Sequence, residues 1–471
     1  MDARSLNFVA NTCSGKILRG SAETPVLRVC SDSRQVQAGD LFVALKGDTF
    51  DGHEFLELVA GKNVAAVMVN SGRGSASGAQ AERLEACPTI EVADTRVALG
   101  KLAAAYRGEF SLPVIAVGGS NGKTTTKDLI AAVLRQKLAT VWSEASFNND
   151  IGVPHTLLRI ESSHQAAVLE AGTNHPGELA PLVQMIQPRF GVITSIGREH
   201  LEFFGDLDGV AKEEGTLAEL LPADGKLFLN GDDSYAAKLA ARSCAEVVQV
   251  GFSDKSQWRI AWCRMSKDGT TFRVVAPNEE FNGDYRINLL GRHQVVNAVF
   301  AIALGAELGL SRAEIELGLA ECKPAKMRLQ LEEHNGIRVL DDAYNANADS
   351  MIAALQTLTD LPCKGRTVAV LGDMAELGVH TEAAHREIGR RAAELGVGQL
   401  LAVGKMASVT AAAAREAGLG RVMEFADVEA AGGVVKNFLK PGDLVLLKAS
   451  RSSRLERITE LLRESNGAHN H

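Results

Sequence analysis

Short apolar runs alternate along the chain with longer segments in which alanine and leucine are mixed with charged residues. Apolar runs of strand type are Val64–Val69, Val114–Val117, Ala166–Leu169, Val192–Ser195, Val368–Leu371, Leu400–Val403 and Leu444–Leu447. Segments of helical type are Arg96–Tyr106, Thr124–Lys137, Arg312–Glu321, Ala383–Leu395 and Met406–Ala417. Because strands that alternate with helices favour parallel sheets with crossover connections, we predict an α/β fold.

Two breaks in this alternation divide the chain into predicted domains. The first lies near Gly108–Pro113, where a helical run gives way to a new strand, and the second near Lys323–Lys326, after a helix and a proline. The predicted domains are residues 1–110, 111–325 and 326–471, which agrees with a prior of ~150 residues per domain for a chain of 471 residues. Within the first domain, Ser71–Gln80 (SGRGSASGAQ) is predicted to be a flexible surface loop.

Composition excludes several classes of protein. A hydrophobic fraction of 46% and a charged fraction of 23% are typical of packed soluble domains. The net charge of -8 and the aromatic fraction of 5% argue against nucleic acid as a partner. No apolar run approaches the ~18 residues of a membrane span, and the N-terminus lacks the pattern of a signal peptide. Seven scattered cysteines without a Cys-x-x-Cys pair suit a reducing compartment, so we expect a cytoplasmic protein without membrane insertion.

The strongest chemical signal is the segment Pro113–Lys127, PVIAVGGSNGKTTTK. An apolar strand leads into a glycine-rich turn and then a helix, an arrangement in which backbone N–H groups and the helix N-terminus bind phosphate. Lys123 would reach the terminal phosphates and Thr124 would bind Mg²⁺. Because Val117 stands where the standard pattern has a glycine, five positions before Gly122, we predict a shortened phosphate loop. A plain glycine turn is disfavoured, since the lysine and threonine follow in the required register.

Several motifs, in order along almost the whole chain, resemble those of one family. The loop GSNGKTT (Gly119–Thr125) resembles the shortened ATP loop of the Mur ligases, the ATP-dependent amide-forming enzymes of peptidoglycan synthesis. The other matching motifs are SDSRQVQAGDLFVALKGDTFDGHEF (Ser31–Phe55), FNNDIGVP (Phe147–Pro154), LEAGTNHPGE (Leu169–Glu178), GREHLEFFG (Gly197–Gly205), GRHQVVNA (Gly291–Ala298), DDAYNANADSM (Asp341–Met351), LGDMAELG (Leu371–Gly378) and KASRSSRLER (Lys448–Arg457). The resemblance implies an N-terminal UDP-sugar-binding domain, a central ATPase domain with a parallel sheet, and a C-terminal Rossmann-like domain.

The motifs NHPGE, DDAYNAN and LGDMAELG are most similar to those of the family member that adds D-alanyl-D-alanine to UDP-N-acetylmuramoyl-tripeptide. The resemblance implies that ATP converts the substrate carboxylate to an acyl phosphate, which the dipeptide amine attacks. Because each charged step brings negatively charged oxygens close together, metal ions and cationic groups should supply most of the stabilisation of the reacting groups. The implied cofactors are ATP and two Mg²⁺ ions, with Mn²⁺ as an alternative ion. The implied partners are the two small-molecule substrates, and we expect a monomer.

The resemblance assigns catalytic roles to Lys123, Glu170, His200 and Lys212, and metal binding to the last three with Thr124. Glu170 ends an apolar strand, which places its carboxylate at the carboxyl edge of a parallel sheet, where it would hold Mg²⁺. His200 follows another buried strand and would ligate a second Mg²⁺; a hydrogen-bonded loop histidine is the alternative.

Lys212 carries a carbamate if it follows similar ligases, in which CO₂ turns the equivalent lysine into a metal-binding anion. The alternative is an exposed helix lysine that pairs with Glu213 or Glu214. Asn174 and His175 of NHPGE are expected near the same site.

The remaining assignments divide between nucleotide and substrates. The expected ATP contacts are Gly119, Ser120, Asn121, Gly122, Lys123, Thr124, Thr125, Asn297 at the adenine, Arg328 at the phosphates, and Asp342, Tyr344 and Asn345 in a closing loop. The expected substrate contacts are Ser33, Arg34, Asp51, Gly52 and His53 for the UDP-sugar, Asn148 and Asn149 for the sugar-peptide, Asn347 in the same closing loop, and Lys448, Ser450 and Arg451 for a carboxylate of the dipeptide. Family members often have asparagine at Gln294 and glycine at Met327, so the chain departs from the pattern beside two of these positions.

Two other interpretations remain open. One is a sister ligase of the same fold, either one that adds a diamino acid or a folylpolyglutamate-type enzyme; DDAYNAN and LGDMAELG oppose it, as does the lack of a DNPR-like motif in the C-terminal third. The other is a phosphate-loop switch or kinase, which would normally have the full-length loop and would leave Ser31–Phe55 unexplained.

Overall fold

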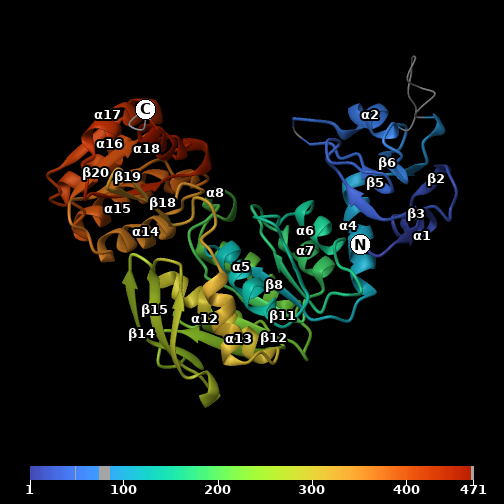
Figure 1. Cartoon of the computed structure of the whole chain (residues 1–471), viewed down its shortest axis with the longest axis horizontal. Helices are drawn as coiled ribbons and strands as arrows, with labels where there is room; N and C mark the ends of the chain where they lie inside the picture. The colour runs from blue at the N-terminus through green and yellow to red at the C-terminus, as the bar shows by residue number, and fades with distance from the viewer. Residues whose placement is uncertain (48, 74–84, 468–471) are drawn as a thin grey trace.

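The computed structural model describes residues 1–47, 49–73 and 85–467, which form three units in series (Figure 1). Each unit has its own large sheet, and the central unit lies between the other two. The predicted α/β class with three domains is confirmed. The surface loop expected at residues 71–80 falls mostly outside the described residues, and the domain boundaries near residues 110 and 325 stay predictions.

The N-terminal unit has a five-stranded sheet of order β2-β7-β6-β5-β4, in which β4 to β7 are parallel. Its strands are β1 (Arg4–Ser5), β2 (Lys16–Arg19), β3 (Pro25–Val26), β4 (Arg28–Cys30), β5 (Asp40–Val43), β6 (Ala66–Asn70) and β7 (Thr89–Val92). Its helices are α1 (Leu6–Thr12), η1 (Gly52–Phe55), α2 (Leu56–Ala60) and α4 (Thr95–Gly108). Leu99, Leu102 and Tyr106 of α4 share an apolar cluster with Val114 of the central unit. A common hydrophobic core therefore holds these two units together.

The central unit contains a nine-stranded sheet of order β16-β15-β14-β13-β12-β11-β8-β10-β9. Its strands are β8 (Val114–Gly118), β9 (Thr140–Trp142), β10 (Ala166–Glu170), β11 (Phe190–Ile193), β12 (Lys226–Asn230), β13 (Glu246–Gly251), β14 (Trp258–Ser266), β15 (Gly269–Val275) and β16 (Gly283–Ile287). The parallel neighbours of β8 are β10 and β11, so the strand order reverses at β8. Ligands of such sheets bind at the carboxyl ends of the strands, at the point of reversal.

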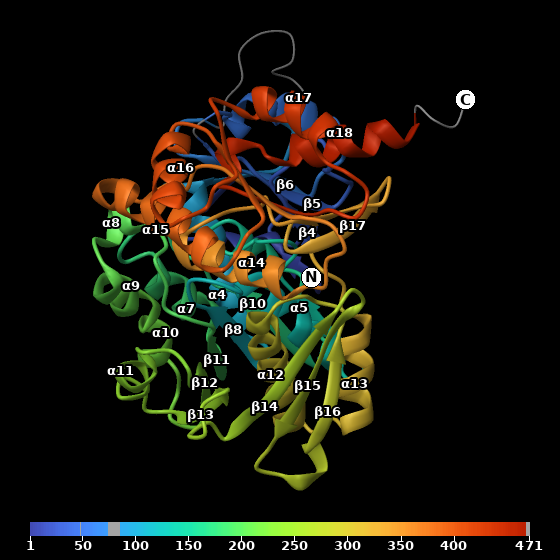
Figure 2. The same cartoon turned by 90° about the vertical axis from the view of Figure 1, so that its left-hand side faces the viewer.

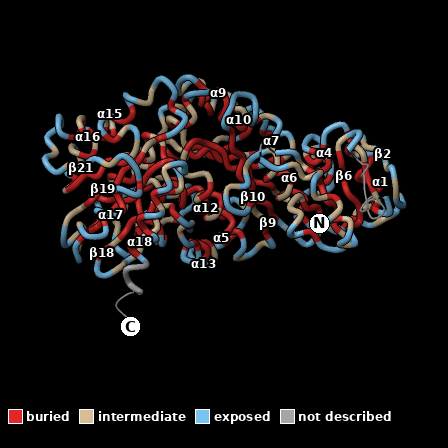
Figure 3. The backbone as a smooth tube through the Cα atoms, turned by 90° about the horizontal axis from the view of Figure 1, so that it is seen from above, coloured by how far each residue is buried: buried red, intermediate tan, exposed pale blue. Residues whose placement is uncertain are grey.

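Helices cover both faces of β8, whose five residues are all buried. Ile115 and Val117 cluster with residues of α5 (Lys123–Leu134), α12 (Arg292–Glu307) and α13 (Arg312–Glu321). Val114 and Ala116 cluster with residues of α6 (Gly152–Leu157) and α7 (Leu179–Ile186) on the other face. The other helices of this unit are α8 (Leu201–Phe204), α9 (Leu207–Glu214), α10 (Thr216–Glu219), α11 (Ala236–Ala240) and η2 (Glu279–Phe281). Figure 3 shows the buried segments running through the middle of each unit.

The C-terminal unit has a six-stranded sheet of order β17-β18-β22-β19-β20-β21, parallel except for β17. Its strands are β17 (Gln330–His334), β18 (Ile337–Asp341), β19 (Thr367–Leu371), β20 (Gln399–Val403), β21 (Val422–Phe425) and β22 (Leu444–Lys448). Its helices are α14 (Ala348–Asp360), η3 (Gly378–His380), α15 (Thr381–Glu394), α16 (Ala407–Glu416), α17 (Val428–Phe438), η4 (Arg451–Ser453) and α18 (Glu456–Gly467).

Two details of the central sheet differ from the sequence prediction. The strand expected at Val192–Ser195 is β11, which ends at Ile193, because Ser195 bonds to the phosphate loop: its carbonyl accepts the N–H of Ser120 at 2.8 Å. The antiparallel strands β14 to β16 were not predicted; they project beside α13 (Figure 2). Within the described ranges, no helix combines the length and the apolar character needed to cross a membrane.

Polar contacts join the central and C-terminal units. Arg198 Nη2, in the segment between β11 and α8, donates to Asp349 Oδ1 of α14 at 2.6 Å, and Arg198 Nη1 pairs with Glu387 of α15. Asn347 Nδ2 donates to Asn121 Oδ1 at 2.9 Å. Leu201 and Phe204 of α8 also share an apolar cluster with Met374 and Leu377 of the C-terminal unit, so this contact combines polar and apolar groups.

We predict that Arg198→Ala shifts the central and C-terminal units towards an open arrangement. The variant loses the bonds to both Asp349 and Glu387, and the loss of even one charge-assisted hydrogen bond, about 1.5 kcal/mol, lowers the closed-to-open ratio roughly tenfold. Small-angle X-ray scattering should therefore give a larger radius of gyration for the variant. The control is Arg386→Ala, which breaks an exposed pair with Glu416 inside the C-terminal unit and should leave the radius unchanged. Equal radii for Arg198→Ala and the unaltered protein would contradict the prediction.

Candidate active site

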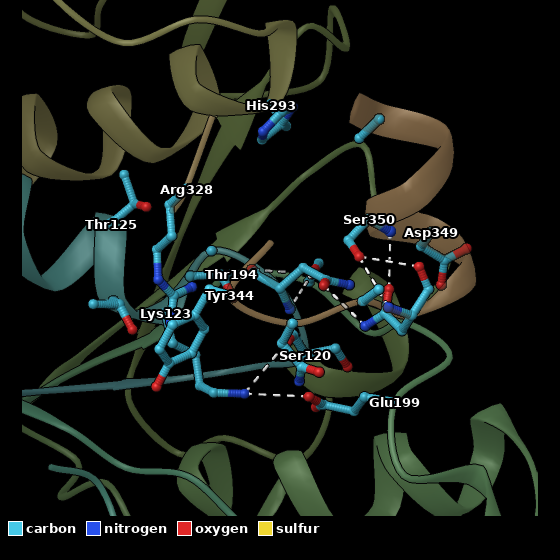
Figure 4. A pocket seen from close by; sticks show the side chains of 18 of the residues that line it. Ser120, Lys123, Thr125, Thr194, Glu199, His293, Arg328, Tyr344, Asp349 and Ser350 are labelled. Atoms are coloured by element: carbon cyan, nitrogen blue, oxygen red, sulfur yellow. Dashed lines mark hydrogen bonds and ion pairs between the residues drawn. The ribbon is translucent and has the colours of Figure 1, made fainter. Parts of the chain in front are cut away.

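A cavity of about 520 Å³ lies at the carboxyl end of β8, between the central and C-terminal units (Figure 4). The central unit contributes the phosphate loop and the segments that follow β10 and β11, and the C-terminal unit contributes the segments that follow β18 and β22. The predicted residues that line the cavity are Ser120, Asn121, Gly122, Lys123, Thr124, Thr125, Asn148, Glu170, Asn174, His200, Asn297, Arg328, Asp342, Tyr344, Asn345, Asn347 and Lys448. Ser120 and Lys448, which are 328 positions apart in the sequence, both line this cavity.

The glycines of the phosphate loop allow its backbone to pack closely against the residues that follow β11. Gly119 has a φ of +103°, and a Cβ there would lie 2.5 Å from Thr194 Oγ1, so the position excludes any side chain. Gly122, with a φ of +89°, stands immediately before α5. The N–H groups of the first turn of a helix have no partner within the helix, so those of α5 can bind an anion.

Lys123 lies in this loop with its ammonium folded back onto the protein. Nζ donates to the carbonyl of Gly119 at 2.5 Å and to Glu199 Oε2 at 3.3 Å, as the dashed lines of Figure 4 show for Glu199. Burial alone would lower the pKa of Lys123, but the carboxylates of Glu199, Glu214 and Glu170 outweigh it and raise the pKa. The lysine is therefore a cation that phosphate oxygens can draw away from the loop carbonyls.

Glu170 ends β10 with one free carboxylate oxygen. Oε1 accepts a hydrogen bond from Asn148 Nδ2 at 2.9 Å, whereas Oε2 is buried and has no partner among the described residues. A free carboxylate oxygen and the hydroxyl of Thr124, both from residues that line the cavity, suit Mg²⁺, which prefers hard oxygen ligands. No group of three or more His, Cys, Asp or Glu side chains within residues 1–47, 49–73 and 85–467 is arranged to hold a metal ion by itself. Substrate oxygens would therefore complete such a site.

His200 and Lys212 lie differently with respect to the cavity. His200 lines it, and Nδ1 is hydrogen-bonded to Glu376, which ties this segment to the C-terminal unit. Lys212 is exposed on α9 and does not line the cavity. The structure thus brings together Lys123, Glu170 and His200, and leaves Lys212 apart.

The C-terminal unit adds charged and aromatic groups. The Arg328 guanidinium lies over the Tyr344 ring, 4.2 Å from its centroid, and Tyr344 Oη is 2.6 Å from Ser146 Oγ of the central unit. Lys448 is buried and donates to Asp342 Oδ2 at 2.5 Å. These groups share the cavity with the phosphate loop, so closure brings them to whatever the loop binds.

Asn297 lies against the loop from α12. Its Nδ2 donates to Gln294 Oε1 at 2.9 Å, and a Cβ at Gly122 would lie 2.8 Å from its Oδ1. Nearby, burial lowers the pKa of His293 to about 4, so this ring is neutral at physiological pH.

The residues predicted for the UDP-sugar lie in the N-terminal unit, outside the cavity. Arg34 is 85% exposed at its side chain and pairs with Asp32 at 2.8 Å. Asp51 accepts from His53 Nδ1 at 2.6 Å and from Arg73 Nη2 at 2.5 Å. His53 Nε2 also accepts the N–H of Asn70, so both of its ring nitrogens are used within the protein.

Other predicted substrate residues have structural partners. The Ser33 carbonyl accepts from Lys62 Nζ at 2.8 Å, and a Cβ at Gly52 would lie 2.8 Å from the Leu45 nitrogen. Asn149 Oδ1 accepts the N–H of Gly152, the first residue of α6, at 2.9 Å. Ser450 and Arg451 lie beyond the cavity, next to β22.

Sequence reasoning missed Glu199 and Glu214 as site residues. Glu199 stands in GREHLEFFG, next to the predicted site residue His200. The sequence pattern predicts Glu214 only as a surface partner of Lys212. The signal that could have found Glu199 is its place in the segment that follows the buried strand β11, at the carboxyl edge of the sheet.

The comparisons with known proteins agree with this arrangement. The description "Mur ligase family, catalytic domain" matches residues 26–107, "Mur ligase middle domain" matches residues 117–305, and "Mur ligase, glutamate ligase domain" matches residues 327–451. The UDP-N-acetylmuramoyl-tripeptide--D-alanyl-D-alanine ligase of Escherichia coli (strain K12) is 36% identical over 93% of this chain and 94% of its own length. The ligase of the same name from Bacillus subtilis (strain 168) is 34% identical over 99% of each chain.

A solved structure is similar to this chain over nearly its whole length. The crystal structure of MurF from Acinetobacter baumannii is 30% identical to this chain, with a TM-score of 0.88 over 98% of this chain and 99% of that one. Matches to three successive family domains and to full-length relatives leave one conclusion: this chain belongs to the Mur ligase family.

Proposed function

We propose that this chain adds D-alanyl-D-alanine to UDP-N-acetylmuramoyl-tripeptide, with ATP as the energy source and an acyl phosphate as the activated carboxylate. The reaction would serve cytoplasmic peptidoglycan precursor synthesis, and the chain would act as a monomer. The observation that carries the proposal is the cavity in which the phosphate loop, Glu170 and the cations of the C-terminal unit meet. The full-length similarity to ligases named for this reaction supports the choice of substrates.

When bound, ATP supplies the phosphoryl group that activates the carboxylate, and Mg²⁺ compensates the charge of the phosphate oxygens. The first N–H groups of α5 bind and orient the phosphates, and Lys123 exchanges the Gly119 carbonyl for phosphate oxygens. Glu170 and Thr124 would hold one metal ion, and His200 would contribute to a second. Each of these groups stabilises negative charge that grows during the reaction.

The two flanking units bind the substrates and complete the nucleotide site. In this proposal the N-terminal unit binds the UDP-sugar through the segment that includes Arg34, whose planar fork suits a pyrophosphate. The C-terminal unit closes Arg328 and Tyr344 over the nucleotide and offers Lys448 to the carboxylate of the dipeptide. Closure also excludes water, which protects an acyl phosphate from hydrolysis.

A phosphate-release assay separates this function from its alternatives. Release should require UDP-N-acetylmuramoyl-tripeptide and D-alanyl-D-alanine together, because the acyl phosphate turns over when the dipeptide amine attacks it. Release with L-lysine, diaminopimelate or glutamate in place of the dipeptide would instead show a sister ligase. Turnover of ATP without either substrate would favour a nucleotide switch.

We predict that Lys123→Ala lowers ATP turnover at least about a hundredfold, since the variant lacks a cation that stabilises the reacting phosphates. Binding of the UDP-substrate, measured by calorimetry, should change little because that site lies on the N-terminal unit. Lys137→Ala serves as the control: this exposed lysine lies beyond the far end of α5 and bonds to the Gly309 carbonyl. An equal loss of turnover and of UDP-substrate binding in Lys123→Ala would contradict the division between units.

A further inference from the structure

Helix α9 directs two adjacent carboxylates into the protein, while Lys212 before them is exposed. The first, Glu213, has both oxygens occupied: Oε1 accepts the N–H of Leu179 at 2.8 Å and Oε2 accepts the N–H of Gly177 at 2.8 Å. Its burial is explained by these bonds, which hold the loop before α7.

The second carboxylate, Glu214, is not explained in this way. Its Oε2 accepts the N–H of Gly119 at 2.6 Å, but Oε1 is buried and has no partner within the described part of the chain. Glu170 shares this property through its own Oε2, and both residues are 1% exposed. A buried carboxylate oxygen without a donor is costly, so each marks a place where something else binds.

The two carboxylates, one from β10 and one from α9, both lie close to the end of β8. Glu170 pairs with Val117 of β8, and a Cβ on the next residue, Gly118, would lie 3.0 Å from Glu214 Oε2. The adjoining phosphate loop would therefore present a bound nucleotide phosphate beside both side chains.

The charge of this region points to the kind of ligand. Glu199, Glu214 and Glu170 all act on the ammonium of Lys123, so buried carboxylates outnumber the cation that faces them. An excess of buried negative charge is unfavourable unless a cation compensates it. A hard divalent ion, which carboxylate oxygens ligate readily, satisfies both the charge and the free oxygens.

We propose that Glu214 is a ligand of a divalent metal ion in the ATP site, where its free oxygen acts together with that of Glu170. Glu214 of α9 then supplies the negative charge that the family resemblance assigned to a carbamate on Lys212. This inference rests on the proposed ATP-dependent reaction. It makes Lys212 an unmodified surface lysine and removes any need for CO₂.

The substitution Glu214→Gln separates charge from loop positioning, because a glutamine carbonyl can still accept the N–H of Gly119. Binding of Mn²⁺ in the presence of ADP, measured by electron paramagnetic resonance of the free ion, should weaken at least about tenfold. Glu219→Gln is the charge-matched control: this acid on α10 is 50% exposed at its side chain and pairs with Arg242, so its loss should leave Mn²⁺ affinity unchanged. Lys212→Met should likewise bind Mn²⁺ as the unaltered protein does.

A second measurement needs no variant and therefore does not depend on whether Glu214→Gln folds. Carbon-13 NMR of the unaltered protein with labelled bicarbonate should show no lysine carbamate signal, and CO₂-depleted buffer should leave Mn²⁺ affinity unchanged. A carbamate signal that disappears in Lys212→Met overturns the proposal, as does Mn²⁺ affinity in folded Glu214→Gln equal to that of the unaltered protein. Because metal binding is measured without the muramoyl substrate, failure of the proposed ligase function would appear separately, as phosphate release that ignores D-alanyl-D-alanine.

Discussion

The buried ammonium of Lys123 is the interaction on which the site depends. A cation in this position requires nearby anions, and the carboxylates of Glu199, Glu214 and Glu170 provide them. These acids come from the segment after β11, from α9 and from the end of β10. The charge balance of one lysine therefore fixes the mutual positions of three segments, each of which forms part of the cavity wall or supports it.

The two unit interfaces differ in how far polar contacts contribute to them. The N-terminal unit is joined to the central unit by apolar side chains such as Leu102 and Tyr106, which favour a fixed arrangement. The C-terminal unit meets it through an apolar cluster that includes Leu201 and Met374 and also through polar pairs such as Asn121 with Asn347, which water can replace at small net cost.

Local patterns predicted much of the fold and the centre of the site, and long-range packing decided the rest. The run Val114–Val117 and the loop that follows it carry their own signals in periodicity and glycine spacing, and both appear where expected. Glu214 has no such signal, because a lysine followed by two acids on a short helix is typical of a solvated face. Its burial follows from the placement of α9 against the end of β8, which depends on residues nearly a hundred positions away. His53 shows the converse: a residue type suited to binding has both ring nitrogens engaged within its own unit.

The shortened loop gives the position of α9 a direct influence on phosphate binding. Val117, in place of an additional glycine, is fully buried in β8, which continues to Gly118, so the first amide of the loop is that of Gly119. This amide donates to Glu214 and is thus committed to the protein, which leaves the amides at the start of α5 for the phosphates. The conformation of the loop then depends on a carboxylate from another element. Any displacement of α9 must move the loop, withdraw an anion from Lys123, or do both, so the helix belongs to the ATP site although Lys212 on its outer face does not.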